Sequence, residues 1–93
     1  NNESSIGDVL KEIIQVNKLQ SGMDQVLVKE AWISLMGKGV NNYTKNVLLK
    51  GNTLYVELTS AVLREELSYG KDKIIKMIND ELRRELITAV VLR

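Results

Sequence analysis

The sequence predicts an α+β fold in which helices pack on one face of a small three-stranded sheet, in the order ααββααβ. Three observations predict this class: apolar residues recur at helical spacing near both ends, a glycine-asparagine turn joins two strand-like segments between them, and a β-rich segment closes the sequence. The 93 residues are 44% hydrophobic, which suits one small core, so we expect a single domain over residues 1–93.

Two helices are expected before the first strand. Ser5 has capping-box spacing to Asp8 and begins a helix that runs to about Leu19, and Ser21 repeats the capping signal for a second helix that ends at Gly37. The apolar stripe of this second helix comprises Met23, Val26, Leu27, Ala31, Trp32 and Leu35. As the sole tryptophan in a sequence without phenylalanine, Trp32 is expected to be a structural core residue rather than a ligand-binding one.

A β-hairpin follows the glycine stop. The segments Asn46–Lys50 and Thr53–Thr59 flank Gly51 and Asn52, a two-residue loop typical of tight hairpins. In the second segment apolar and polar residues alternate, so one face of the sheet is expected to be covered and the other exposed to solvent. The covered face takes Leu54, Val56 and Leu58.

The last part of the sequence returns to helical periodicity and ends in a strand. Ser60 is a plausible N-cap, and Ala89–Leu92 is β-rich. Gly70 either separates two helices or is tolerated inside one long helix, and the sequence leaves both open. The apolar stripe comprises Leu63, Leu67, Ile74, Ile75, Ile78 and Leu82.

Charge is distributed unevenly although the net charge is only +1. The stretch Ala31–Val56 has no acidic residue, which indicates an anionic partner or, alternatively, lysines that protect exposed strand edges. A second basic group begins at Gly70, where interleaved Asp72 and Asp80 favour a solvated, salt-bridged face. The candidate nucleic-acid-binding residues are Lys38, Lys45, Lys50, Arg64, Lys71, Lys73 and Lys76. The candidate structural residues are Trp32, Gly37, Gly51 and Gly70.

Composition argues against several function classes. The absence of histidine and cysteine removes the usual zinc ligands and catalytic groups, and no phosphate-binding loop signature is present, so we expect neither an enzyme nor a cofactor. The longest apolar stretch is too short to span a bilayer, and the lack of cysteine fits a cytoplasmic protein. Because the first residue is Asn1 rather than methionine, we expect a processed or trimmed chain.

Short motifs along nearly the whole sequence resemble the DciA family. They are Ile6-Gly7-Asp8-Val9-Leu10, Ala31-Trp32, Gly37, Tyr43-Thr44, Leu54-Tyr55-Val56-Glu57-Leu58, Ser60-Ala61, Glu66-Leu67 and Val90-Val91-Leu92-Arg93. The resemblance implies a type II K-homology-like domain of order αββααβ that binds DNA and assists loading of the bacterial replicative helicase. K-homology domains hold the nucleic-acid backbone with a Gly-x-x-Gly loop. Here the corresponding segment is Gly70-Lys71-Asp72-Lys73, which departs from that pattern at its second glycine.

Three functional interpretations follow. The first is a DciA-like domain that binds single-stranded or duplex DNA with the replicative helicase as partner, although longer family members carry a tail implicated in helicase contact and this sequence stops at its last strand. The second is an RNA-binding ribosome-associated factor of K-homology topology. The third is a protein-interaction module that adds a partner strand to a free sheet edge. Neither a membrane nor a small-molecule substrate is expected as a partner.

Overall fold

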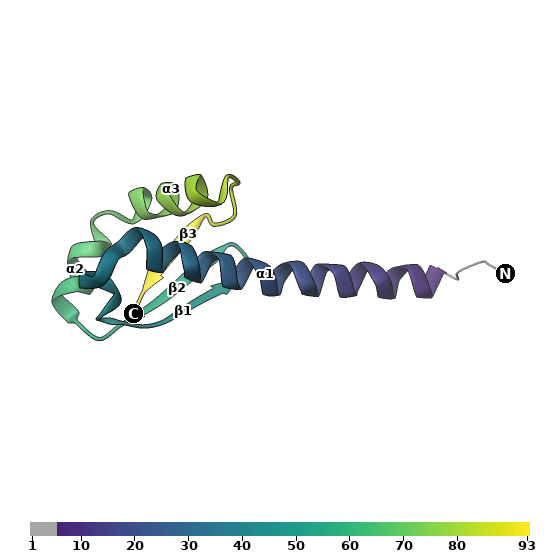
Figure 1. The fold of residues 1–93 in the computed structure, drawn as a ribbon, viewed down its shortest axis with the longest axis horizontal. Helices are drawn as coiled ribbons and strands as arrows, with labels where there is room; N and C mark the ends of the chain where they lie inside the picture. The colour runs from purple at the N-terminus through teal and green to yellow at the C-terminus, as the bar shows by residue number, and fades with distance from the viewer. Residues whose placement is uncertain (1–5) are drawn as a thin grey trace.

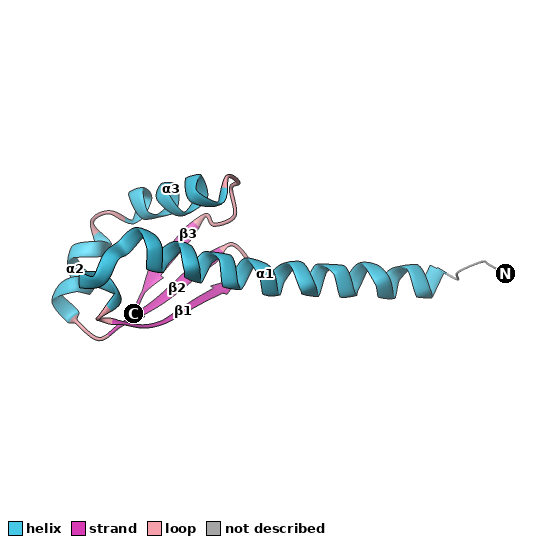
Figure 2. Ribbon diagram, viewed as in Figure 1, coloured by secondary structure: helices cyan, strands magenta, loops and turns pink. Residues whose placement is uncertain are grey.

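The computed structural model describes residues 6–93 and confirms the α+β class (Figure 1). Three strands lie side by side, and the longest helix crosses them (Figure 2). The order is αββααβ, the order that the family resemblance implied. The elements are α1 (Ile6–Asn41), β1 (Thr44–Lys50), β2 (Thr53–Leu58), α2 (Ala61–Ser68), α3 (Lys71–Leu82) and β3 (Ala89–Leu92).

Helix α1 runs without a break through the segment between Leu19 and Ser21, so the prediction of two separate N-terminal helices is wrong. Residues that favour helix starts are also tolerated inside a helix when their side chains bond elsewhere. Asp24, three residues after Ser21 at capping-box spacing, instead accepts a hydrogen bond from the Gln20 side chain one turn earlier, at 2.9 Å. The expected N-cap Ser5 lies outside the described residues.

Only the later part of α1 packs on the sheet. Val28, Ala31 and Trp32 are buried, whereas the expected stripe residues Met23 and Val26 are 57% and 55% exposed. The apolar stripe was therefore assigned to the wrong side of the helix in its first turns. Asp24 and Gln25 bond to the loop after α3 and to β1, so the packed side of α1 passes through these residues and leaves Met23 and Val26 exposed. The earlier turns of α1 project beyond the sheet (Figure 1).

Gly37 ends the regular helix, as its position in the sequence predicts. Its φ of 75° and ψ of 178° are non-helical, and a positive φ of this kind strains residues with a side chain. One further helical turn leads to Asn41. Five residues before Gly37, the indole of the fully buried Trp32 donates from Nε1 to Thr44 Oγ1 at 3.2 Å, and that hydroxyl donates to the Val40 carbonyl at 2.9 Å. The predicted core role of Trp32 is confirmed.

The sheet has the strand order β1-β2-β3. Strands β1 and β2 are antiparallel around the predicted turn at Gly51, whose φ is 59°, and β3 runs parallel to β2. Strand β1 begins at Thr44, two residues earlier than the expected Asn46, and a register irregularity lies between these two residues. The expected covered residues of β2 are buried.

One face of the sheet carries the core. Leu54, Val56 and Ile78 are fully or nearly fully buried there, and Val28 and Ile87 join them. All six residues of the predicted C-terminal stripe belong to this cluster or pack against it. Helices α1, α2 and α3 therefore cover one face, as predicted.

Gly70 separates two helices, which resolves the alternative that the sequence left open. Helix α2 starts at the predicted N-cap Ser60, whose hydroxyl accepts from the Leu63 backbone N–H at 3.1 Å, and Gly70 then occupies the N-cap position of α3. Among the helices of residues 6–93, none combines the length and apolarity that crossing a membrane requires.

Candidate nucleic-acid interface

The sheet face opposite the helices is open. Leu48, Tyr55 and Val91 are direct register partners across the three strands, and their side chains alternate with the core residues, so they point to this second face. All three are partly exposed, and none belongs to the core cluster. We call this surface the open sheet face.

Three cations and one carboxylate border the apolar row of the open sheet face. Lys50 follows Leu48 by two residues and shares its orientation, while Lys45 Nζ lies 3.7 Å from the Glu57 carboxylate. At the end of β3, the Arg93 guanidinium carbon lies 4.8 Å from the centroid of the Tyr55 ring. The Lys45 and Glu57 side chains are 67% and 42% exposed, so their ion pair is weak and opens readily to a competing anion.

The other predicted cations of the first group lie near the far end of the strands. Lys38 is exposed in the last turn of α1, and it precedes β1, whereas Lys50 ends that strand. The seven residues of β1 span roughly 20 Å at ~3.3 Å per residue, so these two lysines mark opposite ends of the sheet. Arg64 is half-buried and donates from its guanidinium to the Leu58 carbonyl at 3.1 Å, which ties α2 to the end of β2.

The lysines of α3 form a separate group. Because Ile74 and Ile78 of α3 pack on the core face, Lys71, Lys73 and Lys76 lie across the sheet from Lys45 and Lys50. Lys76 also pairs with Asp80 at 3.3 Å. The seven candidate cations therefore do not form one surface.

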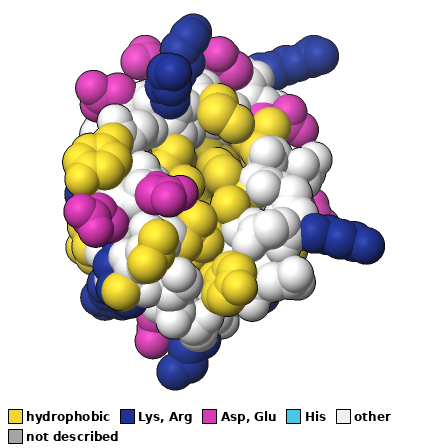
Figure 3. Space-filling view, turned by 90° about the vertical axis from the view of Figure 1, so that its left-hand side faces the viewer, with side chains coloured by type: hydrophobic (Ala, Val, Ile, Leu, Met, Phe, Trp, Pro, Cys, Tyr) yellow, Lys and Arg dark blue, Asp and Glu magenta, His cyan; other side chains and the backbone are white. Residues whose placement is uncertain are grey.

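The segment of Gly70 and Lys73 adopts no extended glycine loop. Gly70 caps α3, and the following residues already form its first turn. The end of the molecule near α2 carries charges of both signs (Figure 3). Hydrophobic side chains gather at the centre of this end with acidic groups among them, and lysines and arginines project from its periphery. Neither feature offers a continuous basic surface.

The free edge of β1 is partly occupied by a side chain. The Gln25 amide of α1 donates to the Val47 carbonyl at 2.9 Å and accepts from the Leu49 backbone N–H at 2.7 Å. A partner strand would need these same two groups, so strand addition is hindered at the middle of this edge. Beside it, a groove separates α1 from the start of β1. Its lining consists of Lys29, Ile33, Asn41, Thr44, Lys45, Asn46 and Val47.

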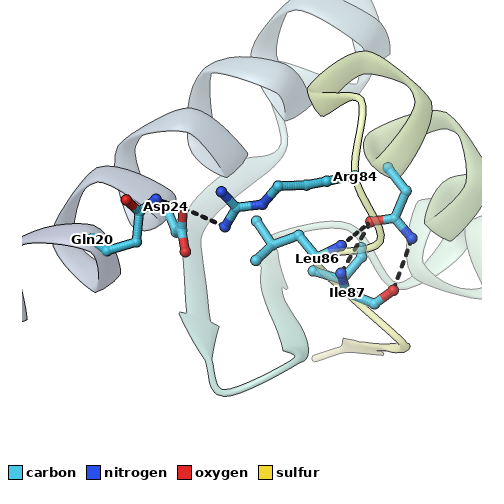
Figure 4. Close-up of polar contacts among 6 residues, drawn as sticks. Gln20, Asp24, Arg84, Leu86 and Ile87 are labelled. Atoms are coloured by element: carbon cyan, nitrogen blue, oxygen red, sulfur yellow. Dashed lines mark hydrogen bonds and ion pairs between the residues drawn. The ribbon is translucent and has the colours of Figure 1, made fainter. Parts of the chain in front are cut away.

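A polar cluster fixes α1 against the loop after α3 (Figure 4). The Arg84 guanidinium lies 2.6 Å from the Asp24 carboxylate, whose side chain is only 12% exposed. In the last turn of α3, the Asn79 side chain accepts from the loop N–H groups of Leu86 and Ile87, each at 3.0 Å, and donates to the Ile87 carbonyl at 2.9 Å. These contacts hold the entry to β3, and through it the position of Arg93, in place.

Sequence reasoning missed Arg93, Gln25 and Asp24 as interacting residues. The alternation of β3 indicates on which face of the sheet Arg93 lies. The contact between its guanidinium and Tyr55 could not be predicted, because it depends on the parallel register of β2 and β3. Among the described residues, no group of three or more acidic side chains is arranged to hold a metal ion.

All the described helices and strands fall within a match to one protein family. The model of that family, described as "Dna[CI] antecedent, DciA", matches residues 5–92. The chain belongs to the DciA family. No curated protein and no solved structure matches the chain.

Membership in the DciA family relates the chain to helicase loading in bacterial DNA replication. DciA proteins are helicase-loading factors and are not known as enzymes. The match gives no support to the alternative of a ribosome-associated RNA-binding factor. The DciA motifs at Ala31-Trp32, Gly37 and Leu54–Leu58 fall on the buried indole, the helix stop and the central strand, so they describe how the fold is built.

Proposed function

We propose that this chain acts in the cytoplasm as a single DNA-binding domain beside the replicative helicase, and that the open sheet face is its DNA-contacting surface. One observation carries the proposal: Lys45, Lys50 and Arg93 border this face, while Glu57 is the one acidic residue in the three strands. Membership in the DciA family supports DNA and the helicase as partners.

Electrostatics favours the open sheet face over the α3 lysines. The α3 group has Asp72 and Asp80 among its lysines, and Lys76 is already paired, so its field on a phosphate chain is weak. On the open sheet face, the single carboxylate faces three cations. Phosphate groups that approach this face therefore meet a net attraction.

The test is a fluorescence-anisotropy titration of the chain with single-stranded DNA, duplex DNA and RNA at several salt concentrations. Three contacts to single-strand phosphates predict a slope of log K against log salt of about −2, at ~0.7 per contact. A variant with Lys45→Gln, Lys50→Gln and Arg93→Gln should lose most of this slope.

A matched control removes the same number of charges from the other side of the sheet, through Lys71→Gln, Lys73→Gln and Lys76→Gln. This control should bind DNA as the unaltered chain does. If the control loses binding instead, α3 is the interface; if no nucleic acid binds the unaltered chain, the proposed function is wrong. Tighter binding of structured RNA than of DNA would favour the ribosome-associated alternative.

Association with the helicase is tested separately. The chain is mixed with the purified replicative helicase of the same bacterium, and the mixture is analysed by size-exclusion chromatography with light scattering. Co-elution is expected. Separate elution at micromolar concentrations would remove direct helicase contact from the proposal while leaving DNA binding in place.

A further inference from the structure

The centre of the open sheet face is an apolar row of side chains. Leu48, Tyr55 and Val91 lie in one row across β1, β2 and β3, with no other residue between them in the register. Neighbouring strands are ~4.8 Å apart, so the row is roughly 10 Å wide. That width accommodates the face of a nucleic-acid base.

Arg93 changes what this row can bind. Its guanidinium lies over the Tyr55 ring at 4.8 Å from the centroid, and Arg93 itself is exposed. A guanidinium over an aromatic ring is held there by cation–π attraction, and both groups are common stacking partners of unpaired bases. Tyr55 and Arg93 thus bring two groups that can stack on bases together on this face.

The cations of the face surround the apolar row rather than fill it. Lys45 and Lys50 lie toward the two ends of β1, and Glu57 is engaged by Lys45. A strand whose bases rest on the row would have its phosphates near these ammonium groups. Duplex DNA hides its base faces inside the helix, so it could use the charges but not the row.

We propose that the open sheet face is a base-stacking platform for single-stranded DNA, with Tyr55 and Arg93 as the stacking groups and Leu48 and Val91 as flanking apolar contacts. This inference rests on the proposed function and adds the form of DNA that is bound and the contacts that select it. The platform binds unpaired bases without regard to sequence, since every base has a face to stack.

The first experiment uses the unaltered chain and compares an oligothymidine with an abasic oligonucleotide of equal length and charge. Base stacking on one aromatic side chain predicts an about 5- to 150-fold preference for the base-bearing strand. Equal affinities, with the salt dependence intact, would overturn the stacking platform and leave the proposed function standing. Absence of binding to either strand would overturn both.

The second experiment uses Tyr55 variants. Tyr55→Ile keeps a residue that favours strands but removes the ring, so affinity for oligothymidine should fall at least about fivefold while affinity for the abasic strand stays unchanged. Tyr55→Phe should retain the preference. The control is Tyr69→Ile, because Tyr69 is 79% exposed on the C-terminal side of α2, away from the platform. An equal loss from Tyr69→Ile would contradict the platform.

A third measurement does not depend on a folded variant. The unaltered chain is photo-crosslinked to oligothymidine that contains 5-iodouracil, and the adduct is located by mass spectrometry. We expect the crosslink on Tyr55. Crosslinks confined to α2 or α3 would overturn the platform, and a stronger signal with the RNA equivalent would replace DNA by RNA as its occupant.

Discussion

The amide of Gln25 offers a sharp test of how α1 and the sheet hold together. It makes two hydrogen bonds to the edge of β1, at 2.9 Å to the Val47 carbonyl and 2.7 Å to the Leu49 N–H, across a long separation in sequence. A typical intramolecular hydrogen bond contributes about 0.5–1.5 kcal/mol, so the two together contribute about 2 kcal/mol. For a domain of this size this is a large share of the total free energy of unfolding.

The substitution Gln25→Met removes both hydrogen bonds with little change in side-chain volume or helix propensity. Unfolding in urea, followed by the fluorescence of the buried Trp32, should show the loss. With a denaturant slope of ~2 kcal/mol/M, a loss of about 2 kcal/mol lowers the midpoint by about 1 M. If the denaturant slope is unchanged and the two urea midpoints agree to within roughly 0.2 M, a stabilising role for this amide is refuted.

The substitution Gln25→Glu tests the hydrogen bond to the Val47 carbonyl apart from the one to the Leu49 N–H, because only the former depends on the pH. A carboxylate still accepts from the Leu49 N–H but repels the Val47 carbonyl, whereas a protonated carboxyl group donates to that carbonyl. The folded state therefore favours the protonated form, and the pKa of the introduced Glu is raised on folding. Its stabilising contribution is fully present below the unfolded pKa of ~4.3 and is lost as pH rises through the folded pKa.

The stability gap between Gln25→Glu and the unaltered chain should accordingly widen from about pH 4 to pH 7. The control Ser34→Glu places a carboxylate at an exposed position of the same helix and should show a smaller, differently shaped pH dependence. A gap that does not change with pH would mean that the amide donor to Val47 contributes nothing.

Three further predictions concern contacts that fix the rest of the fold, each measured by urea unfolding monitored by circular dichroism. Gly37→Ala should cost about 1 kcal/mol or more because of the positive φ, whereas Gly39→Ala, also in open space but at ordinary φ, should be neutral or stabilising; equal effects would contradict the role of φ. Asn79→Ala should cost about 2–4 kcal/mol because three hydrogen bonds are lost, and a cost below about 1 kcal/mol would show that water replaces them. Asp24→Asn should cost about 1 kcal/mol, a modest value because Arg84 is 43% exposed, and Arg84→Gln should not add to it if the two act as a pair.

The local parts of the fold followed from the sequence. The turn at Gly51 and Asn52, the alternation of β2 and the helical stripe after Ser60 each depend on neighbouring residues, and each is present as predicted. The same local reasoning placed a helix start at Ser21, where the structure has helix interior. Asp24 binds Arg84, far along the chain, so its role could not be read from local spacing.

The candidate site was predictable only in part. Regular alternation would direct Lys45 to the same side as Val47 and Leu49, which is the core side. The register irregularity between Thr44 and Asn46 turns Lys45 outward to Glu57 instead, and no sequence signal announced it. The separation of the α3 lysines from those of β1 likewise depends on which face of the sheet α3 covers.

The parallel pairing of β3 with β2 has a consequence for biosynthesis. Arg93 donates its backbone N–H to the Val56 carbonyl at 2.9 Å, and the Leu58 N–H donates to the Arg93 carbonyl at 2.7 Å, so the central strand gains its second neighbour from the final residues of the sequence. While the ribosome still holds those residues, β2 has an unpaired side and the Tyr55 ring has no arginine above it. A nascent chain thus completes its sheet only once β3 has emerged, and translation products interrupted before β3 expose a bare strand that invites aggregation or proteolysis.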